Sequence, residues 1–153
     1  MLFTGHSEHT IDSKLRLAIP AKYRNKWDPA KDGSSWVSVP WPTGQIRLYT
    51  EAEYERVSGS VGQAMPVGEA ADLQLMLFGL AEQLVMDSAG RIALPKTQLE
   101  DTGFKPDQQV IVVGAGKHME IWQPEAFKTI KSATFARIPT LLQNRLQNPP
   151  AST

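Results

Sequence analysis

The sequence contains no cysteine among its 153 residues, which excludes disulfides and thiolate-bound zinc or iron–sulfur sites. It also lacks an excess of either charge, since 16 Lys and Arg balance 16 Asp and Glu, and its 41% hydrophobic content is enough for a core. The longest mainly apolar stretch, Leu73 to Val85, is too short to span a membrane, and residues 1–10 do not resemble a secretory signal. We therefore expect a soluble cytoplasmic protein of one domain or two small coupled units.

The chain has few groups that could support catalysis. Its histidines are His6, His9 and His118, and on a strand the first two would point to opposite faces, so they do not suggest a metal site. The segment 114–118 lacks the spacing of a phosphate-binding loop and is more typical of a hairpin turn. Neither a nucleophile elbow nor a pair of acid–base carboxylates stands out. We expect no enzymatic activity, no cofactor and no metal.

Two nine-residue segments resemble each other at an offset of 75 positions. Residues 12–20 read DSKLRLAIP and residues 87–95 read DSAGRIALP, so that Asp, Ser, Arg, Ala and Pro recur at matching places. A second matched pair follows each segment at an offset of 73, with Leu48, Tyr49 and Tyr54 corresponding to Ile121, Trp122 and Phe127. The sequence therefore predicts one supersecondary unit used twice.

Alternation within the repeated segment predicts a strand. Apolar residues at 15, 17 and 19 would enter the core and place Arg16 on the opposite face; positions 90, 92 and 94 would do the same for Arg91. Pro20 and Pro95 should end these strands. Short helices are then expected at 21–27 and at 96–101, the latter ending before Gly103.

The rest of each unit predicts a hairpin and another helix. Thr50 and Glu53 have capping-box spacing, and Leu73, Leu77 and Leu80 form a helical stripe within 68–81. Residues 133–146 stay open, with a helix after Pro139 as one alternative, and the tail from about 147 is expected to be disordered. The expected hairpin strands are 35–40 with 45–49 and 109–113 with 118–122, the expected helices are 50–57 and 125–131, and the expected loop is 58–67.

Units this small bury little apolar surface alone, so they should pack on each other. We expect a mainly β protein with short helices (α+β), in which two units form a pseudo-twofold barrel. The expected divisions are a first unit at 1–57, a linker and connecting helix at 58–80, a second unit at 81–131, and a C-terminal helix or tail at 132–153.

Positive charge is concentrated near the first repeated segment. Five cations and no acidic residue occur between positions 14 and 26. They could form a basic nucleic-acid-binding face, although Lys22, Arg24 and Lys26 alone could simply be the solvated side of a short helix. Asp12 with Arg16, and Asp87 with Arg91, could be local ion pairs, or each Asp could cap its turn and orient the guanidinium toward phosphate or a guanine edge. The five cations are Lys14, Arg16, Lys22, Arg24 and Lys26.

These segments resemble the signatures of the MraZ family of bacterial transcriptional regulators. The resemblance is carried by Phe3-Thr4-Gly5, by residues 9–24, and by residues 81–95, and it extends over roughly residues 1–142. It implies tandem SpoVT/AbrB-like swapped-hairpin units, ring-shaped homo-oligomers, and binding to repeated operator elements upstream of the division and cell-wall gene cluster. An antitoxin-like or scaffold protein-interaction module is the alternative that the same fold would allow.

The resemblance also implies roles for individual residues. Arg16 and Arg91 would be the main contacts with double-stranded DNA, Asp12 and Asp87 would support them, and Lys14 would add a contact; Lys22 and Arg24 complete the expected DNA-binding set. Such a protein would be cytoplasmic and nucleoid-associated, without a membrane partner.

Three departures from the family pattern stand out. Leu15 occupies the place of the glycine that usually precedes the motif arginine, so a turn requiring positive φ would have to be built differently here. Ala89 occupies the place of Lys14 in the second segment. Residues 28–44 are longer and richer in Trp and Pro than expected, with Trp36 favoured as core and Trp41 left open between core and subunit contact.

Overall fold

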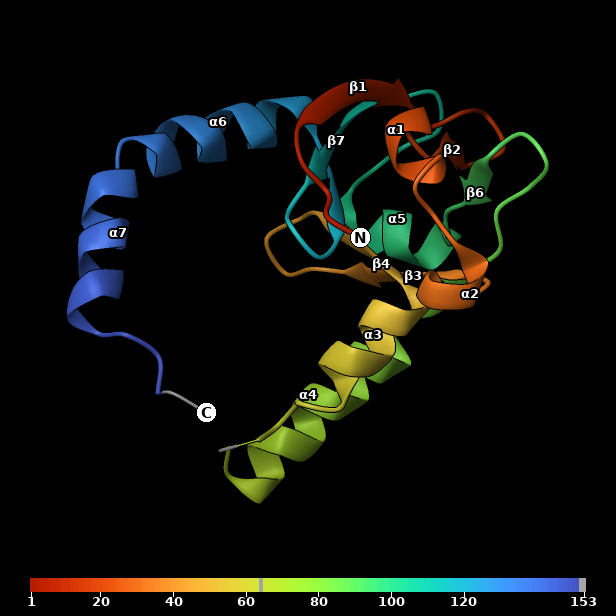
Figure 1. Ribbon diagram of the computed structural model, residues 1–153. Helices are drawn as coiled ribbons and strands as arrows, with labels where there is room; N and C mark the ends of the chain where they lie inside the picture. The colour runs from red at the N-terminus through yellow and green to blue at the C-terminus, as the bar shows by residue number, and fades with distance from the viewer. Residues whose placement is uncertain (64, 152–153) are drawn as a thin grey trace. The chain divides into compact units, whose positions relative to one another are not determined.

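The computed structural model describes residues 1–63 and 65–151 and divides the chain into two units. The first unit is Met1–Gln123. The second begins at Pro124 and consists of helices α6 (Pro124–Phe135) and α7 (Ile138–Gln147) (Figure 1). Residues 152 and 153, within the expected disordered tail, and residue 64, within the expected loop, lie outside the described residues.

The first unit mixes strands and short helices. Its elements are β1 (His6–Thr10), β2 (Arg16–Ala18), α1 (Ala21–Arg24), α2 (Pro29–Asp32), β3 (Trp36–Pro40), β4 (Ile46–Thr50), α3 (Glu51–Ser58), α4 (Val67–Gly79), β5 (Glu82–Leu84), β6 (Arg91–Ala93), α5 (Lys96–Thr102), β7 (Gln109–Gly114) and β8 (Met119–Trp122).

The main sheet has six antiparallel strands in the order β1-β7-β8-β4-β3-β5. A separate two-stranded ribbon pairs β2 with β6. Both sheets therefore join strands from the two halves of the chain. Within the described residues the strand pairing leaves β1 and β5 as edges of an open sheet, so the expected closed barrel is not formed.

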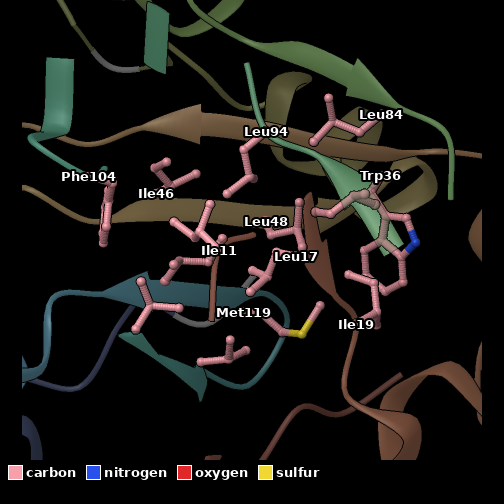
Figure 2. Close-up of a cluster of buried hydrophobic side chains, with 14 of the residues drawn as sticks. Ile11, Leu17, Ile19, Trp36, Ile46, Leu48, Leu84, Leu94, Phe104 and Met119 are labelled. Carbon is pink, nitrogen blue, oxygen red and sulfur yellow. The ribbon is translucent and has the colours of Figure 1, made fainter. Parts of the chain in front are cut away.

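One face of the main sheet carries the large core cluster. Alternation puts Trp36 of β3, Leu48 of β4 and Met119 of β8 on this face, where they meet Leu17 of the ribbon (Figure 2). All of these side chains are at most 1% exposed. The expected burial of Leu17 and Trp36 is confirmed, and the ribbon is held against the sheet by its apolar side.

The opposite face of the sheet packs against part of α3 and α4, which lie side by side and project away from the sheet (Figure 1). The Thr50 hydroxyl accepts a hydrogen bond from the Glu53 backbone N–H at 3.3 Å, so the predicted cap is confirmed. Tyr54 donates its hydroxyl hydrogen to the Leu77 carbonyl at 2.8 Å and ties α3 to α4. Leu77 packs on this face, but Leu73 and Leu80 remain 36% and 40% exposed, so only part of the predicted stripe is buried.

Several other elements follow the expectations with small shifts, whereas α2 lies in a segment for which no helix was predicted. The helix α1 ends at Arg24, shorter than expected, whereas α5 reaches Thr102 and ends at Gly103 with a left-handed φ of 79°. The open segment near the C-terminus forms the end of α6 and then α7, which starts at Ile138, directly before Pro139.

Candidate functional site

The first repeated segment folds as a tight turn organised by Asp12. Its Oδ1 accepts the backbone N–H groups of Lys14 at 2.9 Å and of Arg16 at 2.8 Å. Its Oδ2 accepts the Arg16 Nε–H at 2.8 Å. The Asp12 backbone N–H donates to the Arg16 carbonyl, and the Leu15 N–H donates to the Asp12 carbonyl, both at 3.0 Å, which closes the turn. One carboxylate thus fixes both the backbone of the turn and the direction of the arginine.

The second segment repeats this arrangement around Asp87. Its Oδ1 accepts the backbone N–H groups of Ala89 and Arg91, both at 2.9 Å. Its Oδ2 accepts the Arg91 Nε–H, also at 2.9 Å. The ion pair and the turn cap therefore coexist at each Asp, because one oxygen accepts the backbone N–H groups and the other accepts the arginine Nε–H.

The β2/β6 ribbon presents both arginines on one face. Arg16 pairs with Ala93, and Arg91 pairs with Ala18. Directly paired residues of an antiparallel ribbon point to the same side, so the arginines and the two alanines share one face. Leu17 and Ile92 take the other face and are buried at 1% and 0% exposure. As diagonal neighbours, the arginines start about 7–8 Å apart at the backbone.

Both guanidinium groups remain accessible to solvent. The side chains of Arg16 and Arg91 are 30% and 36% exposed, and those of Asp12 and Asp87 are 34% and 36% exposed. Hydrogen bonds from the Arg16 backbone N–H and side chain hold the pKa of Asp12 below its ordinary value. The equivalent bonds from Arg91 lower the pKa of Asp87. Both carboxylates are therefore charged at neutral pH and keep their arginines oriented.

Comparison with known proteins identifies the chain. It is 34% identical over 128 residues to the transcriptional regulator MraZ of Saccharophagus degradans, covering 82% of this chain and 85% of that protein. It is 33% identical over 135 residues to the Roseiflexus sp. (strain RS-1) protein of the same name, covering 86% and 88%. The chain belongs to the MraZ family. The model of the family described as "MraZ protein, putative antitoxin-like" matches residues 77–143, which include Asp87 and Arg91.

In this member of the MraZ family the other cations predicted to bind DNA are Lys14, Lys22 and Arg24. Two of them, Lys22 and Arg24, also make contacts within the protein. Lys22 donates from Nζ to the Thr4 carbonyl at 2.9 Å and lies over the Tyr23 ring. Arg24 donates from Nη1 to the Ala89 carbonyl at 3.4 Å, inside the second turn. Lys14 is exposed in the first turn. Arg24 thus supports the second turn, a role that its sequence position did not indicate.

The departure at Leu15 has a different outcome from the one expected. Leu15 has φ 63° and Gly90 has φ 77°, so the turn keeps its shape and leucine adopts the left-handed conformation. Leu15 packs against the main core cluster, which offsets part of the strain.

Trp41, left open by the sequence, packs on the second cluster and lies over the Arg47 guanidinium at 3.6 Å.

The described residues give no support to a metal site or a membrane span. Within residues 1–63 and 65–151, His, Asp and Glu side chains do not assemble into a group of three or more that could hold a metal ion. A helix with the length and apolar character needed to cross a membrane is absent from the same residues. Sequence reasoning missed that Ala18 and Ala93, which have small side chains, flank the arginines on the exposed face; the offset of 75 between the two repeated segments could have indicated it.

Proposed function

We propose that this chain is a sequence-specific DNA-binding transcriptional regulator and that Arg16 and Arg91 are its main contacts with double-stranded DNA. The observation that carries the proposal is the placement of both arginines on one face of the β2/β6 ribbon. Relatives across the family are named transcriptional regulators. A ribbon with two oriented guanidinium groups on its outer side has the dimensions that the major groove of DNA admits.

The hydrogen bonds of each arginine leave donors for DNA. Asp12 and Asp87 engage Nε, so the terminal nitrogens of Arg16 and Arg91 can still donate. These nitrogens suit two acceptors, either the O6 and N7 atoms of guanine or two phosphate oxygens. The alanines beside them leave room for a base edge. Asp12 and Asp87 therefore act as positioning residues rather than as DNA contacts.

The surrounding cations would contact the phosphate backbone. Lys14 is the best placed, because it is exposed in the first turn and adjacent to Arg16. Lys22 can reach a phosphate with its remaining N–H donors, whereas Arg24 would act mainly by holding the Ala89 carbonyl. Phosphate contacts of this kind fix register and raise affinity without reading sequence.

The architecture fits two SpoVT/AbrB-like swapped-hairpin units, at 1–57 and 81–131. Each strand of the first unit has a counterpart in the second: β1 corresponds to β5, β3 to β7 and β4 to β8. When every strand is exchanged for its counterpart, the order β1-β7-β8-β4-β3-β5 becomes the same order read from the other end. Leu17 pairs with Ile92, its own counterpart 75 positions later. A local twofold axis through this pair would relate Arg16 to Arg91, and both would then meet DNA in equivalent ways.

Assembly would supply the affinity that one subunit lacks. Two arginines and a few lysines give modest, salt-sensitive binding. A homo-oligomeric ring on direct operator repeats would add sites through effective concentration, which can raise avidity by about 10²–10⁴. The resemblance to the family supports the further proposal that these operators lie upstream of the division and cell-wall gene cluster and that the protein works in the cytoplasm at the nucleoid.

The test is selection of bound duplexes from random DNA, followed by fluorescence anisotropy on the recovered sequence. Short direct repeats should be recovered. The variant Arg16→Ala/Arg91→Ala should lose at least tenfold in affinity while keeping its mass by light scattering. Lys31→Ala/Arg56→Ala is the matched control, because it removes two positive charges from α2 and α3. It should bind nearly as well as wild type.

Two results would contradict the proposal. Recovery of no preferred sequence would exclude specific binding, and an arginine variant that binds like wild type would exclude this ribbon as the site. Purification with a stoichiometric protein partner, together with absent DNA binding, would favour the antitoxin-like alternative.

A further inference from the structure

The exposed face of the β2/β6 ribbon has two apolar positions at its centre. Ala18 of β2 and Ala93 of β6 are both exposed to solvent, and they share this face with Arg16 and Arg91. Alanine occurs at both places, 75 positions apart. Each unit therefore contributes one methyl group and one guanidinium group to the face that the proposed function assigns to DNA.

Backbone hydrogen bonds show that each alanine lies close to an arginine. The Ile19 N–H donates to the Gly90 carbonyl at 2.9 Å, and the Leu94 N–H donates to the Leu15 carbonyl at 2.8 Å. Hydrogen-bonded and non-hydrogen-bonded pairs alternate along an antiparallel ribbon, so both Arg–Ala pairs are of the non-hydrogen-bonded kind, in which opposite side chains are closest. The β-carbons of each pair are thus about 4.5–5.5 Å apart.

The arginines leave these methyl groups uncovered. Each Nε–H is bonded to the aspartate of its own turn, at 2.8 Å for Arg16 and 2.9 Å for Arg91. The arginine side chains therefore bend back toward their turns, and Ala18 and Ala93 stay exposed. A surface that follows the phosphate backbone carries cations, hydroxyl groups or backbone N–H groups, whereas a methyl group has no donor for a phosphate oxygen. The centre of the ribbon is therefore suited to base edges.

We propose that Ala18 and Ala93 read thymine bases through their C5-methyl groups, beside the sites bound by Arg16 and Arg91. This inference rests on the proposed function and names two further specificity-determining residues. Thymine presents a methyl group in the major groove, and alanine is one of the side chains that contact it. The two units then make equivalent contacts, each with one arginine and one alanine.

The first experiment removes single methyl groups from the DNA. In a single-repeat duplex of the sequence recovered by selection, each thymine is replaced in turn by deoxyuridine, which pairs in the same way and lacks only the C5-methyl group. Anisotropy with the full-length chain should show two replacements that each weaken binding about fourfold, the loss expected for one buried methyl group. Uridine duplexes that all bind like the parent duplex would overturn the proposal, and so would a recovered sequence without thymine.

The second experiment removes the methyl groups of the protein. Ala18→Gly/Ala93→Gly should bind the thymine duplex more weakly than wild type and should no longer distinguish it from the uridine duplexes, because the DNA methyl groups have lost their contacts. Ala115→Gly is the matched control, since Ala115 is an exposed alanine between β7 and β8; it should keep the wild-type ratio of thymine to uridine affinity. The same ratio in the double glycine variant would mean that another group reads the methyl groups.

Single variants separate base reading from a general disturbance of the ribbon. Ala18→Gly alone should abolish the effect of one uridine replacement and keep the other, and Ala93→Gly alone should do the reverse. A ribbon loosened by glycine would lose both effects together, and that result would overturn the assignment of one thymine to each alanine. Circular dichroism and light scattering should show wild-type folding and mass for all variants.

The arginine variant distinguishes a failure of this inference from a failure of the proposed function. If the affinity of wild type depends on Arg16 and Arg91 but not on the thymine methyl groups, the alanines do not read thymine and the proposed function stands. If wild type selects no sequence, or if Arg16→Ala/Arg91→Ala binds equally well, the proposed function fails and this inference fails with it.

Discussion

Leu15 and Gly90 occupy the same position in the two Asp turns, and both have left-handed backbones, with φ 63° and 77°. Their surroundings differ. Leu15 packs on the core cluster that contains Leu99, whereas the α-carbon of Gly90 faces the guanidinium of Arg24. Leu99 stands 75 positions after Arg24, so at these two corresponding positions one unit has glycine and arginine and the other has leucines that belong to or pack on the same core cluster.

Gly90→Ala should destabilise the protein by more than its backbone strain alone. A methyl group at this position would overlap Arg24 Nη1 and force that side chain off the turn. The left-handed conformation adds about 1–2 kcal/mol for a residue with a β-carbon. In an Arg24→Ala background the steric part should disappear and only the strain should remain. Urea unfolding of the single and double variants measures both parts, and equal costs of Gly90→Ala in the two backgrounds would contradict the assignment.

This turn also shows how far sequence reasoning reached. The repeat at 12–20 and 87–95 predicted the strands, the outward arginines and the capping aspartates, because these depend on local spacing. It did not predict that leucine would adopt a positive φ. That outcome depends on the core that receives the Leu15 side chain, and tertiary packing of this kind leaves no local signal.

The Asp turns should make stability sensitive to acid. The pKa values of Asp12 and Asp87 lie below the ordinary 3.8, chiefly because of hydrogen bonds from the backbone N–H groups of Arg16 and Arg91. A carboxyl with a lowered folded pKa stabilises the fold fully above its unfolded pKa, and this stabilisation is lost as pH falls through the folded value. Stability should therefore decrease below about pH 4–5.

Urea titrations at a series of pH values test this dependence. Asp12→Asn/Asp87→Asn should be less stable than wild type at neutral pH and should lose less on acidification. Some acid loss should remain, since the pKa values of Glu51 and Glu53 are also lowered by hydrogen bonds, mainly from the Ser34 backbone and from the Arg56 side chain. Glu55→Gln is the control and should follow the wild-type curve. If the Asp variant loses as much stability on acidification as wild type, Asp12 and Asp87 do not cause the acid sensitivity.

Gln98 should be important for stability although it is polar. Its side chain is buried in α5 and donates from Nε2 to the carbonyls of Ser38 at 3.1 Å and Leu80 at 2.8 Å. Gln98→Met keeps similar volume and removes both bonds, so it should cost about 1–3 kcal/mol. The free energy of unfolding in urea measures this loss. A Gln98→Met chain as stable as wild type would mean that the two bonds are offset by the cost of burying Gln98 Oε1, which has no hydrogen-bond partner in the described part of the chain.

Gln98 and α4 show which parts of the fold the sequence could not reveal. The helix at 96–101 was predicted, but a glutamine in it is ordinarily solvated, and its burial follows from the approach of β3. The apolar stripe in α4 was predicted, but Leu73 and Leu80 are exposed because one face of the sheet accepts only Leu77 from it. Periodicity identifies an apolar face and does not tell whether the same chain covers it.

The difference between Lys14 and Ala89 should appear in the salt dependence of DNA binding. Both positions precede a motif arginine by two residues, yet only the first turn carries the extra cation. Each added phosphate contact steepens the logarithmic dependence of affinity on salt by about 0.9. Ala89→Lys should therefore bind DNA more tightly at low salt with a steeper slope, and Lys14→Ala should do the opposite. Anisotropy titrations over a salt series measure both. If Lys14→Ala lowers the slope and Ala89→Lys leaves it unchanged, the two turns do not meet DNA equivalently, and the twofold relation between Arg16 and Arg91 would not extend to the complex.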